Sequence, residues 1–350
     1  MSLTPERRQQ LMLAMQETQA MQLAFIGLTN GLLQVLAQKT PALAPQTLAP
    51  QTLAAQTLAA QAGVDAGYVV RWCDAAYAFG LLDEPEAGCF TLTEDGRAFL
   101  PGQPGSLMPM AVGAVLGAHM AERAATLMKS GVRPGEQVLA ERESILPWFG
   151  PMLEASFSPV FEQEILPGVP AFAEINQRQG LAVDLGCGNG WYLRRLAKHM
   201  PGLRGLGLDG FGENVRQATQ LAQAAGLGQR LSFREGDIYR FTPDVPVDLV
   251  AMNRALHHVW DKKNQVFGLL RDMLKPGGYA VIWEPNWPEA RTALRHPSRR
   301  PMAMQNLMEH IQGNHFLNPD LIVQAFAQVD MKATVHLFAQ GNEMVVVGQR

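Results

Sequence analysis

Five short apolar segments place the tightest constraint on the fold of this chain. Helical stretches separate them between residues 180 and 285, and their sequences are GLAVDLG, LRGLGLD, LSFREGD, VDLVAMN and YAVIWEP. Buried strands of a parallel sheet have this length and content, and repeated strand–helix–strand order is typical of a sheet covered by helices on both faces. We therefore predict an α/β fold, with an open, doubly wound, Rossmann-like domain over residues 179–350.

The earlier part of the chain shows helical spacing instead. Residues 58–100 have the order helix, turn, helix, hairpin, which is a winged-helix pattern. We predict a mostly α-helical winged-helix domain over residues 1–104. A helical linker over residues 105–178 is then expected to cover an acceptor pocket.

A five-residue repeat interrupts the first domain. From Pro45 to Gln61 the chain reads PQTLA, PQTLA, AQTLA and AQ. This period matches neither a helical heptad nor a solenoid unit, and the repeat is too short to build a core of its own. We interpret it as a duplicated insertion in a surface loop, at residues 41–61.

Charge argues against nucleic acid as the partner of the winged-helix segment. The formal net charge is −3, and the helix predicted from Asp65 to Leu82 offers only Arg71 as a cation, whereas phosphate neutralisation needs several. A ligand-sensing, DNA-binding regulator is therefore a remote alternative. We expect a packing and homodimerisation module, with the apolar residues from Met21 to Leu36 as the partner surface.

The composition indicates a soluble cytoplasmic protein. The N-terminus has no apolar signal-peptide core, and no apolar run is long enough to span a bilayer, so we expect no membrane partner. The three cysteines, Cys73, Cys89 and Cys187, are too scattered for a disulfide framework or a zinc cluster. We expect them to be reduced packing residues.

A glycine-rich turn, VDLGCGNGWYL, follows the first apolar segment. Gly186, Gly188 and Gly190 stand at alternate positions. The sixth position of a dinucleotide-binding fingerprint must be glycine, and here it is Trp191. Asp184 precedes the turn, where a carboxylate disfavours a phosphate and favours a cation. S-adenosylmethionine carries an ammonium and a sulfonium but no phosphate, so we predict it as the cofactor, with the glycines admitting it close to the backbone.

Polar residues also end the next segments. Asp209, followed by Gly210, ends the second segment about twenty residues past the turn, where a carboxylate can accept hydrogen bonds from both ribose hydroxyls. Asp237 ends the third segment and suits the adenine amino group, with Ile238 against the ring. Asn253 ends the fourth segment and completes the cofactor-binding candidates. Acids at successive strand ends after a glycine turn indicate one shared ligand, whereas a single such aspartate is more often a helix cap.

These motifs resemble those of the class I S-adenosylmethionine-dependent methyltransferases. The resemblance covers residues 180–350 and rests on VDLGCGNG, GLDG, GDIY, VDLVAMNRALHHV and LKPGGYAVIWEP. With the winged-helix pattern before it, the whole chain resembles the small-molecule O-methyltransferases and their C-methylating relatives. The resemblance implies an enzyme that methylates a small-molecule acceptor, with an N-terminal domain that dimerises and helps to close the acceptor pocket.

Two mechanisms are open for the histidines after the fourth segment, His257 and His258. In O-methyltransferases of this architecture, a histidine in a Leu-His-Asp-Trp type of segment is the general base, and His257 resembles it. Here His258 stands in place of the aspartate, and tryptophan comes one place late, at Trp260. On this alternative the protein O-methylates a hydroxylated natural product.

The other mechanism is a metal site. Some C-methyltransferases of α-keto acids, the phenylpyruvate methyltransferases among them, hold iron with two histidines, which His257 and His310 resemble. The third ligand is open between His258, Gln312 and water. A divalent metal, iron or zinc, that chelates the keto oxygen and the carboxylate would acidify the neighbouring C–H. We favour this metal-assisted C-methylation of an α-keto acid, although a hydrogen-bonded rim position is the competing interpretation of His310.

An acidic acceptor also needs a cationic partner in the pocket. Arginine binds carboxylates in bidentate fashion. Arg123 and Arg254 are the candidates for this role.

Overall fold

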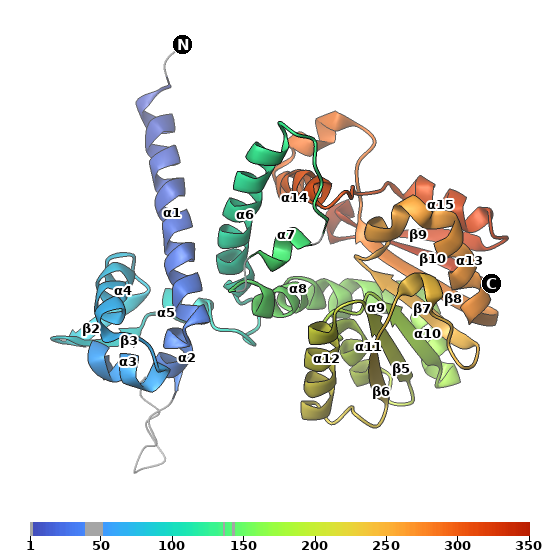
Figure 1. Ribbon diagram of the computed structural model, residues 1–350, viewed down its shortest axis with the longest axis horizontal. Coiled ribbons are helices and arrows are strands. Elements are labelled where there is room, and N and C mark those ends of the chain that lie inside the picture. The colour runs from blue at the N-terminus through green and yellow to red at the C-terminus, as the bar shows by residue number, and fades with distance from the viewer. Residues whose placement is uncertain (1–2, 39–51, 136, 142–143) are drawn as a thin grey trace. The chain divides into compact units, whose positions relative to one another are not determined.

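The structure of the protein is a computed structural model that describes residues 3–350 apart from 39–51, 136 and 142–143 (Figure 1). The chain divides into two compact units, one of residues 1–122 and 142–155 and the other of residues 123–141 and 156–350. Helices α6 (Met108–Leu127) and α8 (Leu146–Val160) have residues in both units. The predicted linker is therefore divided between the two units, and its limits stay predictions.

The first unit has the helix, turn, helix and hairpin order that the sequence predicts. Asp65 begins the second of these helices, where its carboxylate accepts a hydrogen bond from the backbone N–H of Tyr68 at 2.9 Å. Strand β3 pairs antiparallel with β1 and with β2. The elements are α1 (Pro5–Thr29), α2 (Leu32–Ala37), β1 (Leu53–Ala54), α3 (Ala55–Ala62), α4 (Ala66–Ala78), β2 (Leu82–Glu86), β3 (Cys89–Leu92) and α5 (Glu94–Ala98).

The second half of the five-residue repeat corrects the surface-loop interpretation. Residues 45–51 lie outside the described part of the chain, but residues 53–61 form β1 and most of α3. Ala55, Leu58 and Ala59 are buried in the core of this unit. Alanine and leucine are strong helix formers, and their spacing in AQTLAAQA puts them on one helical face, so this part of the repeat folds as a core helix.

Helix α1 corrects the predicted partner surface. Phe25, Leu28 and Leu32 pack into the core of their own unit and are at most 7% exposed. Most exposed apolar side chains of α1 lie earlier, where Leu11 and Met15 are 47% and 66% exposed, while Ile26 is the exposed one within the predicted surface, at 44%. A partner that covers most of the apolar surface on this helix would therefore meet residues 11–15.

Helix α4 carries the cation on which the DNA-binding alternative depends. Arg71 is the one cation of α4, and its Nη1 donates a hydrogen bond to the carbonyl of Gly67 in the same helix. Phosphate binding needs several free cations on one surface. The helix therefore adds nothing in favour of that alternative.

The second unit is built on a seven-stranded sheet with the order β6-β5-β4-β7-β8-β10-β9. The five apolar segments are its five parallel strands, and β10 runs antiparallel to β8 and β9, so the doubly wound α/β fold is the one predicted. The strand order reverses beside β4 and β7, and open sheets of this kind bind ligands beyond the carboxyl ends of the strands at that point. The strands are β4 (Leu181–Leu185), β5 (Arg204–Asp209), β6 (Leu231–Glu235), β7 (Val247–Asn253), β8 (Leu274–Pro285), β9 (Lys332–Phe338) and β10 (Glu343–Gln349).

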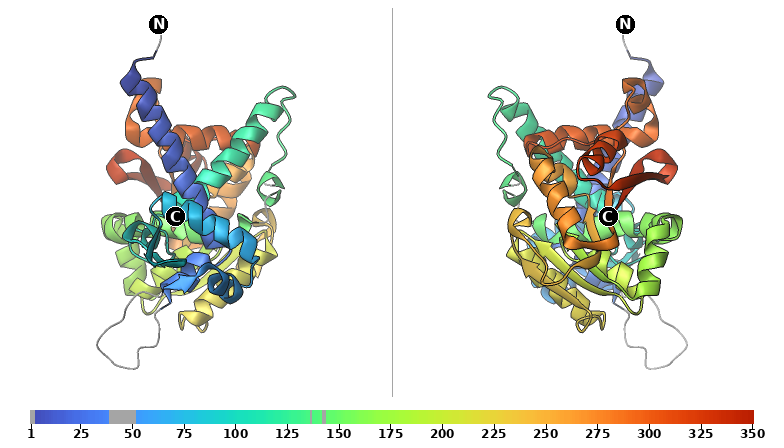
Figure 2. Two further views of the ribbon diagram at one scale, coloured as in Figure 1. Left: turned by 90° about the vertical axis from the view of Figure 1, so that its left-hand side faces the viewer. Right: turned by 90° about the vertical axis from the view of Figure 1, so that its right-hand side faces the viewer.

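Helices cover both faces of the sheet. Successive strand residues point to opposite faces, so Val183 joins the core cluster under α13 and α15, and Ala182 joins the cluster under α10 and α11. In the right-hand view of Figure 2, orange α13 and light-green α10 lie on opposite sides of the strands. The remaining helices are α7 (Gln137–Ala140), the π-helix η1 (Phe161–Ile165), α9 (Leu166–Gly168), α10 (Pro170–Arg178), α11 (Trp191–His199), α12 (Gly212–Ala224), α13 (Lys263–Met273), α14 (Arg300–Ile311), α15 (Pro319–Ala327) and the short 3₁₀ turns η2 (Ile238–Arg240), η3 (Leu256–Lys262), η4 (Arg291–Arg295), η5 (Pro297–Arg299) and η6 (Ala339–Gly341).

Two further expectations concern the whole chain. Within the described ranges, none of the helices combines the length and the apolar character that a membrane crossing requires. All three cysteines are free thiols, and Cys73 and Cys187 are buried. The cysteines are therefore packing residues, as expected.

Candidate active site at the carboxyl edge of the sheet

The glycine-rich turn follows β4 directly. Gly186, Gly188 and Gly190 have φ angles of 75°, 53° and 72°, a left-handed region in which other residues are strained. A Cβ on Gly186 would lie 2.8 Å from the Cβ of Ala255, and one on Gly190 would lie 2.5 Å from the ring of Phe233. A Cβ on Gly188 would meet no described atom within 4 Å. Gly188 therefore borders open space, and its backbone is the part of the turn that a ligand can approach.

Asp209, at the end of β5, holds this turn in place. Its buried carboxylate accepts hydrogen bonds from the backbone N–H groups of Gly188 at 2.8 Å and Phe211 at 3.0 Å. It also accepts one from the side-chain amide of Asn214 at 3.0 Å. A carboxylate can accept about four hydrogen bonds, so one position remains for a ribose hydroxyl. The ribose role of Asp209 and Gly210 stays a prediction.

Three buried polar atoms near the turn have no hydrogen-bond partner within the described chain. They are Asp184 Oδ1, Asn189 Nδ2 and Asn253 Oδ1. Asp184 on β4 is in register with Ala251 on β7, two residues before Asn253. Burial, and then the nearby charge of Asp209, raise the pKa of Asp184 to about 8. A buried acceptor without a donor is costly, and a cationic ligand would supply the missing donor.

Asp237 and Ile238 follow β6. One carboxylate oxygen of Asp237 accepts a hydrogen bond from the backbone N–H of Tyr239 at 2.9 Å, and the other lies 3.7 Å from Nε of Arg240. Ile238 packs against the core under α13. Asp237 therefore caps the 3₁₀ turn η2, and the contacts of both residues with adenine stay predictions.

His257 lies in η3, just after β7, and Glu284 of the neighbouring strand β8 orients its ring. Nδ1 of His257 is 2.6 Å from one oxygen of Glu284. The other oxygen of Glu284 accepts a hydrogen bond from the backbone N–H of Leu256 at 2.8 Å. Because Glu284 accepts the hydrogen bond from the N–H of Nδ1, the Nε2 atom is left to face another partner.

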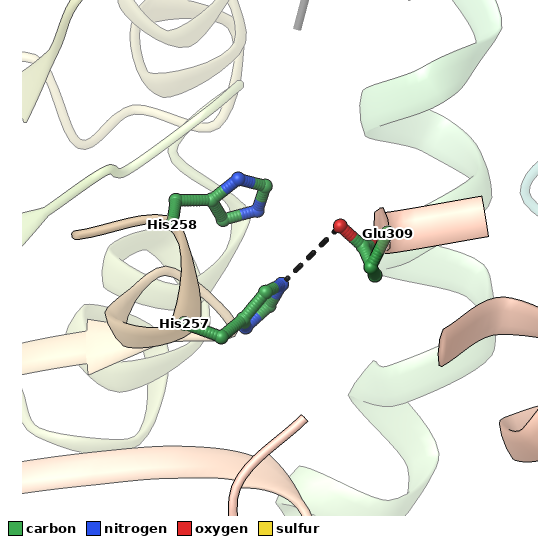
Figure 3. A group of neighbouring side chains, drawn as sticks. All are labelled: His257, His258 and Glu309. Carbon is green, nitrogen blue, oxygen red and sulfur yellow. Dashed lines mark ion pairs between the residues drawn. The ribbon is translucent and has the colours of Figure 1, made fainter. Parts of the chain in front are cut away.

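Three side chains converge in front of that Nε2 atom (Figure 3). Nε2 of His257 has no hydrogen-bond partner among the described residues and lies 3.7 Å from an oxygen of Glu309 on α14. The rings of His257 and His258 are 4.2 Å apart between centroids, and Nδ1 of His258 is 2.8 Å from the side-chain amide of Asn314. One ligand atom from each of His257, His258 and Glu309 lies within 4.8 Å of the other two. Two histidines and one carboxylate are a donor set that iron(II) and zinc accept.

Burial and the neighbouring carboxylates shift the pKa of His257 in opposite directions. Burial lowers the pKa of His257, but the carboxylates of Glu284 and Glu309 outweigh it and raise that pKa to about 9. Burial raises the pKa of Glu309, yet the two histidines hold it below its ordinary value. With these neighbours alone the imidazole keeps its proton at neutral pH, and a protonated histidine is a poor general base.

His310 does not join this group, which corrects its predicted pairing with His257. Its Nε2 accepts a hydrogen bond from Nε of Arg133 at 3.2 Å. Consecutive helix residues point about 100° apart, so Glu309 faces His257 while His310 faces away. The side-chain amide of Gln312, a third-ligand candidate, donates to Glu309 at 3.1 Å instead.

Each predicted arginine already pairs with a carboxylate of this chain. Nε of Arg123 is 3.2 Å from an oxygen of Glu141. Nη1 of Arg254 is 2.7 Å from an oxygen of Glu343, and both side chains are about nine-tenths buried. The carboxylate-binding role of these arginines is therefore not supported.

Sequence reasoning missed the carboxylates around His257. Glu284 ends the fifth apolar segment as Asp209 ends the second, so the rule that selected Asp209 could have selected it. Glu309 has no such signal, because its sequence neighbours do not say which face of α14 meets η3.

Comparisons with known proteins agree with the fold. Residues 182–278 match the family model described as a methyltransferase domain. An O-methyltransferase family protein from Burkholderia thailandensis aligns over 100% of this chain and 99% of its own, with a TM-score of 0.69 and 17% identity. Human N-acetylserotonin methyltransferase in complex with S-adenosylmethionine aligns over 100% and 99%, with a TM-score of 0.72 and 18% identity.

A curated relative covers less of the chain. Trans-aconitate 2-methyltransferase from Streptomyces avermitilis is 32% identical over 122 residues, which are 35% of this chain and 44% of that protein. The chain spans less than half the length of the first three curated relatives that it matches. The solved structures therefore support the fold of the whole chain. The curated relatives show sequence similarity over only part of it.

Proposed function

Because the chain carries a methyltransferase domain and has the fold of the class I S-adenosylmethionine-dependent methyltransferases, we propose that it methylates a small-molecule acceptor. The observation that carries the cofactor assignment is the set of unpartnered buried atoms, Asp184 Oδ1 above all, beside the open Gly188 backbone. S-adenosylmethionine supplies a methyl group on a positively charged sulfur. Asp184, Asp209 and Asn253 would hold it beside the glycine turn, with the Asp184 carboxylate balancing its positive charge.

At the acceptor end we propose a divalent metal, iron or zinc, held by His257, His258 and Glu309. This set replaces the predicted pair of His257 and His310. The fit rests on the convergence of three ligand atoms within 4.8 Å and on Nε2 of His257, which makes no hydrogen bond within the described residues and only the 3.7 Å ion pair with Glu309. Such an ion would polarise the keto oxygen of an α-keto acid and acidify the neighbouring C–H, so the proposed reaction is C-methylation.

The chain's own residues would prepare this site. Glu284 holds the Nδ1 proton of His257 and fixes the direction of its ring, as carboxylates behind metal-bound histidines do. The ring of Phe316 packs edge-on against His257 at 5.4 Å between centroids. His257 and Glu309 are 4% and 8% exposed, so little water screens the charges that act on an acceptor here.

O-methylation is the second candidate function. The 2.6 Å contact of His257 with Glu284 favours it, because a carboxylate that orients an imidazole is also found behind histidine general bases. On this alternative, Nε2 of His257 would take the proton of an acceptor hydroxyl. Glu309, which faces that atom, would then set the charge of the ring and bind no metal.

Elemental analysis of untagged protein, purified without chelator, separates the two candidates. We expect about one equivalent of iron or zinc per chain, lost in Glu309→Ala and retained in His310→Ala. The two variants change neighbouring residues of one helix, so each controls for damage to α14. Wild-type protein that holds no metal, and takes up none from added iron(II) or zinc, would contradict the metal site and favour His257 as the base.

We also propose that a second copy of the chain covers the exposed apolar part of α1. Met12 and Met15 are 62% and 66% exposed there. Light scattering of the wild type should give the mass of a dimer, and Met12→Asp with Met15→Asp should give that of a monomer. A wild-type monomer at micromolar concentration would contradict this proposal.

A further inference from the structure

Arg254 stands between the two halves of the proposed site. It follows Asn253, whose Oδ1 has no hydrogen-bond partner among the described residues, and precedes the turn that carries His257. Its φ angle is 55°, in the left-handed region, where a residue with a long side chain is rare. Such a backbone persists only where the surrounding contacts fix it, and it is found most often at functional sites.

Arg254 is fixed from three directions. Its backbone N–H donates to the carbonyl of Trp283 on β8 at 2.7 Å. Its Nη1 donates to Glu343 on β10 at 2.7 Å, and the indole N–H of Trp283 donates to the same oxygen at 2.8 Å. The guanidinium also lies over the ring of Phe157, 4.0 Å from its centroid. These contacts tie the end of β7 to the two strands that follow it in the sheet.

We propose that Arg254 is a positioning residue whose buried ion pair with Glu343 holds the turn that aims Asn253 at the cofactor and His257 at the acceptor. This inference rests on the proposed function. A buried ion pair is weak evidence for a purely stabilising role, because desolvation offsets much of its attraction. Strain in the backbone, by contrast, is expected where direction matters more than stability.

The amino ends of the same strands offer a control ion pair, although its lysine is more exposed than Arg254. Lys275 and Asp248, the second residues of β8 and β7, form an ion pair of 2.8 Å. Lys275→Met therefore removes an ion pair from the same two strands, far from the turn, and Arg254→Met makes the corresponding change at the site. Arg254→Gly adds a third comparison, because it relieves the left-handed strain while it also removes the ion pair.

The test uses titration calorimetry with S-adenosylmethionine and ¹⁵N NMR of histidine-labelled protein, in which the His257 ring is identified by its loss in His257→Ala. We expect Arg254→Met and Arg254→Gly to weaken cofactor binding about tenfold and to shift the His257 ring signals. Lys275→Met should leave both unchanged. If Arg254→Met fails to fold, Glu343→Gln removes the same ion pair with almost no change of shape and should reproduce the effect.

The outcomes separate this inference from the proposed function. Wild-type protein that does not bind S-adenosylmethionine contradicts the proposed function itself. Wild-type binding, with Arg254→Met or Glu343→Gln no different from Lys275→Met in affinity and in the His257 signals, overturns the positioning role alone. Full recovery in Arg254→Gly would also overturn it, because backbone strain would then be the only effect of residue 254.

Discussion

The two ends of the parallel strands differ in whether buried polar atoms are left without a hydrogen bond. At the amino edge, Asp248 accepts hydrogen bonds from Lys275 at 2.8 Å and from the backbone N–H of Leu181 at 2.9 Å. At the carboxyl edge, by contrast, Asp184 Oδ1 and His257 Nε2 have no hydrogen-bond partner in the described part of the chain. The same strands β4 and β7 run between the two edges.

Within this one sheet, the difference distinguishes polar groups that stabilise the fold from polar groups that are available to a ligand. A buried polar group that is fully paired stabilises the fold, whereas one left without a partner costs stability and is kept where a ligand completes it. The paired edge should therefore respond to substitution through stability, and the unpaired edge through ligand binding.

Among the effects on metal binding, the largest is expected at Glu284, which contacts the ring of His257. Glu284→Gln removes the carboxylate that fixes the ring, and partners of this kind change metal affinity about 10- to 100-fold. We expect zinc affinity to fall by that amount in competition with a coloured chelator. Asp248→Asn, the same kind of change at the amino edge, should keep wild-type affinity. Equal zinc affinity in wild type and Glu284→Gln would contradict the role of Glu284 in orienting His257 for the metal.

The glycine turn gives the next largest effect. A Cβ on Gly188 would point into open space, so Gly188→Ala should cost only about 1 kcal/mol of stability, from its left-handed backbone, yet lower cofactor affinity. Gly190→Ala would meet the ring of Phe233 and should lower the free energy of unfolding by more. Urea denaturation and calorimetry measure the two quantities. If Gly188→Ala instead lowered the free energy of unfolding more than Gly190→Ala did and left cofactor affinity unchanged, the turn would have a packing role only.

The pKa of Asp184 predicts a proton exchange. A carboxyl with a pKa of about 8 is mostly protonated at pH 7, so binding a cation there should release about 0.9 proton. Calorimetry in two buffers of different ionisation enthalpy measures this release, which Asp184→Asn should abolish. Cofactor affinity should fall as the pH drops below 8. A wild type that releases no proton at pH 7 would contradict the assignment.

The same shift fixes the sign of a stability effect. The folded pKa of Asp184 lies above its ordinary value of 3.8, so between pH 4 and 8 the folded protein holds a proton that the unfolded chain has lost. This group's contribution to the free energy of unfolding is therefore largest at low pH and is lost as the pH rises toward 8. Asp184→Asn should make the ligand-free protein more stable at pH 8, as thermal denaturation would show.

The smallest effect is expected at the amino edge. Lys275 is 47% exposed, so its ion pair with Asp248 is partly screened by water. Lys275→Met should lower the free energy of unfolding by at most about 1 kcal/mol, with unchanged cofactor affinity. A loss of cofactor binding in Lys275→Met would contradict the claim that the amino ends of the strands take no part in ligand binding.

The sequence predicted the strands and the glycine turn because their signals are local. An apolar run followed by Asp209 or by Gly186 needs no knowledge of distant residues. The choice between Glu309 and His310 depends on how α14 is rotated toward His257 in η3, which its sequence does not determine. Glu343 was missed for a related reason, because only the strand order brings the start of β10 beside Arg254.

The repeat shows the opposite error. Its five-residue period suggested an inserted loop, yet Leu58 and Ala59 are core residues of α3. Composition decided the structure there, because alanine and leucine favour a helix whatever the origin of the segment.

The central claim is that the unpaired edge binds a cationic cofactor and the paired edge does not take part. Titration of S-adenosylmethionine into wild type, Asp184→Asn and Asp248→Asn at pH 8 tests it most directly. We predict one site per chain in the wild type, about 100-fold weaker binding in Asp184→Asn, and wild-type affinity in Asp248→Asn. Equal affinity in wild type and Asp184→Asn would contradict the account.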